Sequence, residues 1–272
     1  MGTMGSFLTP DGFARPPLTA VLGESSLVLE TGRYLARSRA ARPTRRATPT
    51  VVRVASEPVI LVPGFMAGDG TLALLAHRLR GEGLRTYRSH IRANIGCTRN
   101  AAALLESRIE AIALKRGARV QIVGHSLGGL LGRGLAVRRP DLVSGVVTMG
   151  SPMLAPGAHH LSLTVLVEML NRLSRAGVPG LMAEDCVAGE CAATSFAEAR
   201  EPLSDGVRLT AVWSKRDGIV DPRSCVDPEG TSVEVRASHL GMAVDPATHD
   251  AVLAALRQGI SRTGSRSTPT VS

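Results

Sequence analysis

Lysine and aromatic residues are scarce in this 272-residue chain, and both scarcities narrow the possible functions. The 32 basic residues include only two lysines, Lys115 and Lys215, so the formal net charge of +9 comes almost entirely from arginine. Aromatic residues make up 3% of the chain, too few for the stacking surfaces that bind single-stranded nucleic acids. We therefore expect no nucleic-acid partner, although the positive charge would favour contact with anionic interfaces.

Long apolar runs are also absent. A membrane-spanning helix needs about 20 consecutive apolar residues, and the best stretch, Leu161 to Leu170, is interrupted by Glu168. The first residues lack a secretory pattern because Asp11 and Glu24 interrupt them. We expect a cytoplasmic protein, or a secreted one whose leader has been removed.

Cysteine is rare, with four residues, Cys97, Cys186, Cys191 and Cys225. Cys186 and Cys191 are close enough in sequence to close one short loop, which would leave Cys97 and Cys225 to pair across the fold. Free thiols in a reducing compartment are equally consistent with the sequence. None of the four has CxxC spacing or a nearby pair of histidines, so the spacing predicts no metal site.

The length and the 44% of apolar residues are sufficient for a large core and exclude a disordered chain. Residues 1–57 are expected to form a helical segment followed by a basic linker, with six arginines between residues 33 and 46. Residues 58–262 are expected to form the main domain, and residues 263–272 a frayed tail.

Apolar strand patterns alternate with helical patterns through the main domain, which predicts an α/β fold with a mostly parallel central sheet flanked by helices. The predicted strands are 58–62, 84–88, 119–123, 143–149, 207–213 and 231–235, and the principal helices between and after them are 71–80, 99–115, 127–138 and 247–259.

The motif Gly124-His125-Ser126-Leu127-Gly128 lies directly between a predicted strand and a predicted helix. A serine on such a turn points out of the sheet, and small neighbours let the turn pack closely. The following helix also directs its positive N-terminal dipole towards developing negative charge. Ser126 is therefore the candidate nucleophile.

Together with three other segments, this motif resembles the α/β-hydrolase superfamily, in particular bacterial lipases and esterases. The segments are Leu61-Val62-Pro63-Gly64-Phe65, Gly124 to Gly129, Ser214 to Val220, and Ser238-His239-Leu240-Gly241, in the chain order of the family. The resemblance covers residues 58–260 and implies a Ser-His-Asp hydrolase with a helical cap.

A serine hydroxyl needs a base, and the base needs a carboxylate that orients it. The family order is serine, acid, histidine. His239 follows the last predicted strand and is the candidate base. Asp217 follows the preceding strand and is the preferred acid, with Asp221 as its rival in the same loop.

Acyl transfer also requires two backbone N–H donors for the developing oxyanion. Leu127 N–H, directly after the nucleophile, is one candidate. The resemblance to Pro-Gly-x lipases implies Phe65 N–H as the other, with Met66 as the alternative, and a preference for simple acyl esters over bulky tertiary-alcohol esters.

Residues 153–205 lie between two predicted core strands, where lipases carry a cap or lid. The apolar residues of 161–173 would suit either an acyl-binding wall or lipid-facing lid, or a helix packed on the core. Residues predicted to bind substrate are Met66, Met153, Leu166 and Met242.

The sequence thus predicts a serine carboxylic-ester hydrolase, similar to carboxylesterases and triacylglycerol lipases, that needs no metal or organic cofactor. Its expected partner is a small lipid-like ester, with transient contact to a lipid interface. Two alternatives remain: an acyltransferase that uses the same acyl-enzyme, and a non-catalytic binding protein with this fold.

Overall fold

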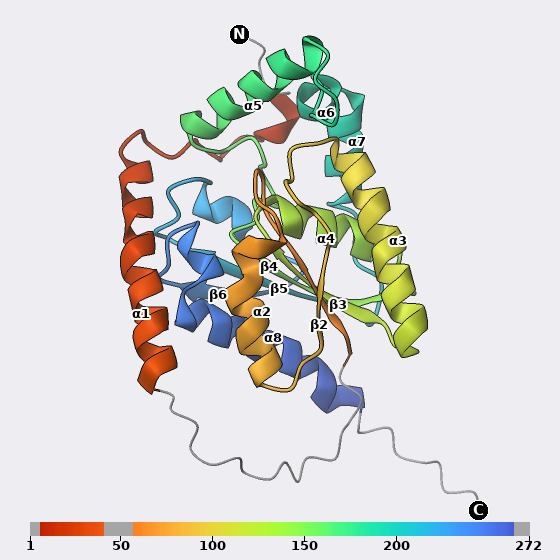
Figure 1. Cartoon of the computed structure of the whole chain (residues 1–272). Helices are drawn as coiled ribbons and strands as arrows, with labels where there is room; N and C mark the ends of the chain where they lie inside the picture. Colours follow the sequence, from red (N-terminus) through yellow and green to blue (C-terminus); the bar gives the residue numbers. More distant parts are fainter. Residues whose placement is uncertain (1–5, 41–56, 264–272) are drawn as a thin grey trace, which may run out of the picture.

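Six parallel strands form one sheet in the order β2-β1-β3-β4-β5-β6 (Figure 1). The computed structural model describes residues 6–40 and 57–263. The strands are β1 (Val59–Val62), β2 (Thr86–Arg88), β3 (Val120–His125), β4 (Val143–Met149), β5 (Arg208–Ser214) and β6 (Thr231–Val235). The predicted α/β class and parallel sheet are confirmed.

Helices cover both faces of the sheet, as short apolar strands in a parallel sheet require. The eight α-helices of the described residues are α1 (Leu27–Ala40), α2 (Ala73–Gly81), α3 (Thr98–Arg116), α4 (Leu127–Arg138), α5 (Leu161–Arg175), α6 (Asp185–Ala188), α7 (Glu190–Glu198) and α8 (Pro246–Thr263). Helices α2 and α8 lie on one face, and α3 and α4 lie on the other.

Strand β1 illustrates how the sequence produces these two layers. Its four residues are all buried, and alternate side chains point to opposite faces of the sheet. Val59 and Leu61 pack in the cluster with α2 and α8, whereas Ile60 and Val62 pack in the cluster with α3 and α4. A continuous apolar run is therefore what a central strand needs.

Two further units lie outside the sheet and its four flanking helices. The segment between β4 and β5 carries α5, α6 and α7, which gather beyond one end of the sheet (Figure 1). Helix α1, with the short 3-10 helix η2 (Ala20–Ser26) before it, packs against α8, where the Tyr34 and His249 rings meet edge to face. In the described residues, no helix is both long enough and apolar enough to cross a membrane.

Parallel strands align their carboxyl ends at the same edge of the sheet, where α/β proteins build their sites. Ser126 follows β3, Asp217 follows β5 and His239 follows β6, so the fold brings all three loops to that edge.

Candidate active site

Ser126 lies on a sharp turn immediately after β3 and immediately before α4. Its backbone has φ 51° and ψ −121°, a left-handed conformation that is strained for a residue other than glycine. The side chain does not cap α4, and Ser126 lines the cavity described below. The turn thus presents the hydroxyl at the carboxyl edge of the sheet.

The glycines of the motif allow this turn to pack tightly. A Cβ atom on Gly124 would overlap the backbone of Gly129, and one on Gly128 would overlap the carbonyl oxygen of Val62. Strand β3, the start of α4 and the end of β1 therefore approach more closely than any side chain would permit.

Asp217 and His239 are joined by a hydrogen bond of 2.6 Å, in which His239 Nδ1–H donates to Asp217 Oδ2. Both side chains are buried. The other carboxylate oxygen, Oδ1, accepts the N–H groups of Ile219 and Val220, each at 2.9 Å. The carboxylate is thus fixed at both ends, and it fixes the imidazole with Nε2 as the remaining ring nitrogen.

Gly150 lies over this pair. It has φ 56°, and a Cβ atom there would lie 3.1 Å from His239 Nδ1 and 3.2 Å from Asp217 Oδ2. Any larger residue would press on the hydrogen bond between the two side chains.

The rival carboxylate, Asp221, has different partners. Its two oxygens accept the guanidinium and backbone N–H of Arg223, and Oδ2 also accepts Ala14 N–H at 3.0 Å. Burial raises the pKa of Asp221, but the hydrogen bonds from Arg223 and Ala14, with the charge of Arg223, together outweigh burial and leave the pKa below its ordinary value. Asp221 therefore holds a loop, while Asp217 holds the histidine.

Two histidine rings lie close together in the site, and their surroundings shift their pKa values in opposite directions. Burial lowers the pKa of His239, but the charge and hydrogen bond of Asp217, with a contribution from Glu24, outweigh burial and raise it overall. Burial and the nearby His239 lower the pKa of His125 to about 4. The ring centroids are 5.0 Å apart, and His125 Nε2–H donates to the His239 carbonyl at 2.9 Å. Neutral His125 thus ties the serine turn to the histidine loop.

The loop after β1 touches the serine turn. A Cβ atom on Gly64 would lie 3.1 Å from both His125 O and Ser126 Cβ. Met66 N–H donates to Asn94 O at 3.1 Å, so this donor is already used. Within the described part of the chain, the N–H groups of Phe65 and Leu127 make no hydrogen bond. Both residues line the same cavity as Ser126, so these two amides, unlike that of Met66, have no protein partner there.

Two buried carboxylates from the N-terminal segment hold the loops of Asp217 and His239, a feature that the sequence interpretation missed. Glu24 Oε1 accepts Gly218 N–H and His239 N–H, each at 3.0 Å, and Oε2 accepts Leu240 N–H at 2.9 Å. Glu30 accepts Ser238 N–H at 2.8 Å and Ser238 Oγ–H at 2.9 Å. We call these two residues the glutamate clamp.

The clamp accounts for another glycine of the motif around His239. A Cβ atom on Gly241 would overlap the carboxylate of Glu30. The sequence around Glu24 and Glu30 contains no local signal that shows where these carboxylates bind.

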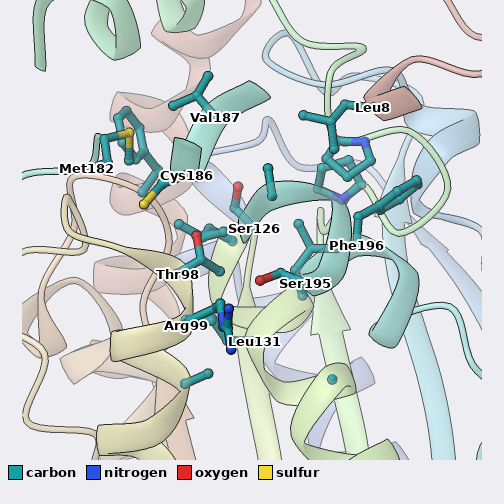
Figure 2. Close-up of a pocket in the computed structure, with 18 of the residues that line it drawn as sticks. Leu8, Thr98, Arg99, Ser126, Leu131, Met182, Cys186, Val187, Ser195 and Phe196 are labelled. Carbon is teal, nitrogen blue, oxygen red and sulfur yellow. The ribbon is translucent and has the colours of Figure 1, made fainter. Parts of the chain in front are cut away.

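A cavity of about 180 Å³ opens beside Ser126, Phe65 and Leu127 (Figure 2). Its floor includes residues of α4, and its walls come from the start of α3 and from the segment between β4 and β5, which we call the insertion. In Figure 2, Met182, Cys186 and Val187 lie on one side of Ser126, and Leu8 and Phe196 on the other. Most of these side chains are apolar, so the cavity suits a hydrocarbon chain.

The four residues predicted to bind substrate lie outside this lining. Met153 and Met242 are fully buried, and Met242 packs in the core under α2 and α8. Met66 is exposed and does not line the cavity. Helix α5 contributes Leu163 and Val167, which are four residues apart on one helix face, whereas Leu166 does not line the cavity.

Comparison with known proteins agrees with this architecture. A family model for the alpha/beta hydrolase fold matches residues 82–179. The chain has the α/β-hydrolase fold. The mature lipase BlEst2 of Bacillus licheniformis is 14% identical, with a TM-score of 0.59 over 75% of this chain and 93% of that one. The monoacylglycerol lipase of Paleococcus ferrophilus is 19% identical, with a TM-score of 0.51 over 75% of this chain and 94% of that one. This chain thus shares its fold with lipases at low sequence identity.

Proposed function

We propose that this α/β-hydrolase cleaves carboxylic esters through an acyl-enzyme formed on Ser126. The observation that carries the proposal is the 2.6 Å bond between buried His239 and Asp217 at the sheet edge that also presents Ser126. A histidine oriented in this way is the standard base for a serine nucleophile.

In the first half of the reaction, Ser126 Oγ attacks the ester carbonyl carbon while His239 Nε2 takes the hydroxyl proton. Asp217 stabilises the imidazolium that results, since its carboxylate already accepts the Nδ1–H. The carbonyl oxygen becomes an oxyanion and accepts hydrogen bonds from the amides of Phe65 and Leu127. His239 then returns the proton to the leaving alcohol, and the acyl group stays on Ser126.

In the second half, water attacks the acyl-enzyme along the same path. His239 takes a proton from the water, the same two amides stabilise the second oxyanion, and the free acid leaves as Ser126 recovers its proton. Every proton moves through His239, so the protonation state of that residue governs both halves.

The proposed substrate class is an ester with an apolar acyl chain, because the cavity beside Ser126 is lined mostly by aliphatic residues. The outer face of α5 favours a substrate at a lipid surface. Leu161, Val165, Met169 and Leu173 follow one another at four-residue spacing, and each is at least 41% exposed. An exposed apolar stripe on a helix that also lines an apolar cavity favours lipase activity over the hydrolysis of small dissolved esters.

The direct test is turnover of p-nitrophenyl esters over a range of acyl lengths. We expect turnover by the wild-type protein and none above background by Ser126→Ala. Ser195→Ala removes another hydroxyl from the same cavity and should retain activity within about threefold. Turnover that survives in Ser126→Ala, or an inactive wild-type protein at every acyl length, would overturn the proposal.

A further inference from the structure

Three cysteines that are far apart in the sequence meet beside the cavity. Cys97 precedes α3, Cys186 lies in α6 and Cys191 lies in α7. Their sulfur atoms all lie within 4.8 Å of one another, and Cys97 Sγ and Cys191 Sγ are 3.7 Å apart. We call this group the thiol cluster. Cys225 is buried in the loop after β5 and is not part of it.

The distances fit ligands of one metal ion better than a disulfide. A disulfide requires two sulfurs at about 2.05 Å, so one pair would have to move closer and the third thiol would be left over. A thiolate bound to Zn²⁺ lies about 2.3 Å from the ion, which places the sulfurs of a tetrahedral site about 3.8 Å apart. The 3.7 Å between Cys97 Sγ and Cys191 Sγ matches that second arrangement, and the other two sulfur pairs lie within 4.8 Å.

We propose that the thiol cluster binds one thiophilic metal ion of the Zn²⁺ type, with Cys97, Cys186 and Cys191 as thiolate ligands. No further Cys, His, Asp or Glu among the described residues joins the cluster, so the fourth position would be taken by water. Cys97 and Cys186 are half-buried, which leaves solvent a route to that position.

The position of Cys97 also favours a thiolate at that residue. Cys97 is the N-cap residue of α3, a helix of 19 residues, and the partial positive charge at a helix N-terminus stabilises an anion. Arg99, in the first turn of the same helix, also lines the cavity (Figure 2). Three separate segments thus provide both the ligands and part of the compensating charge.

Such an ion would join the insertion to the main domain. Val187, Ala192 and Phe196 belong to α6 and α7 and line the cavity, and the metal would fix both helices to the start of α3. Because these helices line the cavity, the ion would also influence which acyl chains fit there. That influence rests on the proposed function, but metal binding itself does not. The measurements below contain no ester and so can fail independently of it.

The test uses the full chain, reduced and freed of metal, titrated with Co²⁺ as a spectroscopic probe. We expect one equivalent of Co²⁺ to produce thiolate-to-metal charge-transfer bands, and Zn²⁺ to remove them by displacement. Cys97→Ser, Cys186→Ser and Cys191→Ser should each abolish the stoichiometric bands. Cys225→Ala, which removes a thiol outside the cluster, should keep them.

Thermal unfolding provides a second measurement and shows whether each variant folds. Zn²⁺ should raise the Tm of the wild type and of Cys225→Ala, because an ion that binds only the folded state stabilises it. It should not raise the Tm of Cys186→Ser, whose half-exposed position tolerates serine. Unchanged bands in Cys97→Ser would overturn the proposal. So would a reduced wild-type protein that takes up no Co²⁺ and instead forms a Cys97–Cys191 disulfide in air.

Discussion

The turn that carries Ser126 and the loop that carries His239 lie at the same sheet edge but are built in opposite ways. The serine turn is made by its own neighbours: strand β3 before it, α4 after it, and glycines that let the backbones touch. The histidine loop is held by residues from the other end of the chain. The hydrogen bonds of Glu24 and Glu30 reach over 194 to 216 residues of sequence.

This difference has a physical consequence. A strained turn fixed by close packing has few ways to relax, whereas a loop held by hydrogen bonds depends on whether those acceptors are charged and in place. Changes at the serine turn should therefore abolish the reaction, and changes in the glutamate clamp should weaken it and alter its pH dependence.

Among changes around the loop that carries His239, the largest loss of activity is expected for Asp217→Asn. An amide cannot stabilise the imidazolium and favours the wrong ring tautomer, so kcat should fall about 10⁴-fold. Asp221→Asn, in the same loop but bonded to Arg223 and Ala14, should lower kcat by less than about tenfold. The measurement is kcat for ester hydrolysis by both purified variants. Equal losses of kcat would show that Asp217 is not the carboxylate that serves His239.

The sequence was sufficient to predict those features of the site that follow from local pattern and chain order. Ser126 was predicted from a motif between a strand and a helix, and Asp217 and His239 from their places after the last two strands of the main domain. The parallel sheet was predicted because continuous apolar runs alternate with helical periods. Assignment of catalytic roles to these residues remains the proposal above.

The rest of the site depends on contacts that no local pattern encodes. Glu24 resembles any acidic residue of a surface helix until the fold brings it to the histidine loop. Likewise, the spacing of Cys97, Cys186 and Cys191 matches no metal motif, because the third ligand comes from a segment about 90 residues away. Met153 and Met242 were predicted to bind substrate, but both are buried and neither lines the cavity, because flexible apolar side chains fill a core as readily as a pocket.

The second-largest effect is expected for Glu24→Ala. It would leave the N–H groups of Gly218, His239 and Leu240 without their acceptor, at a cost of roughly 1–3 kcal/mol for each of the two buried donors, Gly218 and His239, that stays unsatisfied. The displaced histidine loop should lower kcat about 10–100-fold, since small displacements of a reacting group are costly. KM should change less, because Glu24 does not line the cavity.

The matched control is Glu57→Gln, which changes a carboxylate bonded to Ser144 and Arg208 away from the site. Its kcat should stay within about twofold of wild type. If Glu24→Ala loses stability but keeps full kcat per folded molecule, the clamp only stabilises the fold and does not position His239.

A smaller effect concerns pH. His239 must be neutral to accept a proton, so activity should fall as pH decreases through its pKa, which Asp217 and Glu24 hold above the ordinary 6.5. The acidic limb of kcat/KM should therefore have its midpoint above 6.5. Glu24→Gln removes one negative charge but keeps a side chain of the same size, so it should move that midpoint to lower pH. If the midpoint of the acidic limb is the same in Glu24→Gln and the wild type, Glu24 does not contribute to the raised pKa of His239.

The smallest effect is expected on the outer face of α5. Val165 is 60% exposed, so Val165→Ser should change the free energy of unfolding by no more than about 0.5 kcal/mol. It should weaken activity on an emulsified ester several-fold while hydrolysis of a dissolved short-chain ester stays unchanged. Equal effects on both substrates would show that the stripe has no role at an interface.

The most direct test of the whole account is covalent labelling by an organophosphonate ester, followed by mass spectrometry of the intact chain and of its peptides. We predict one phosphonyl group per chain, bound to Ser126, with a labelling rate that falls sharply in Asp217→Asn and more moderately in Glu24→Ala. An unlabelled wild-type chain, or a label that persists in Ser126→Ala at the same rate, would contradict the claim that Ser126 is a nucleophile activated from the clamped histidine loop.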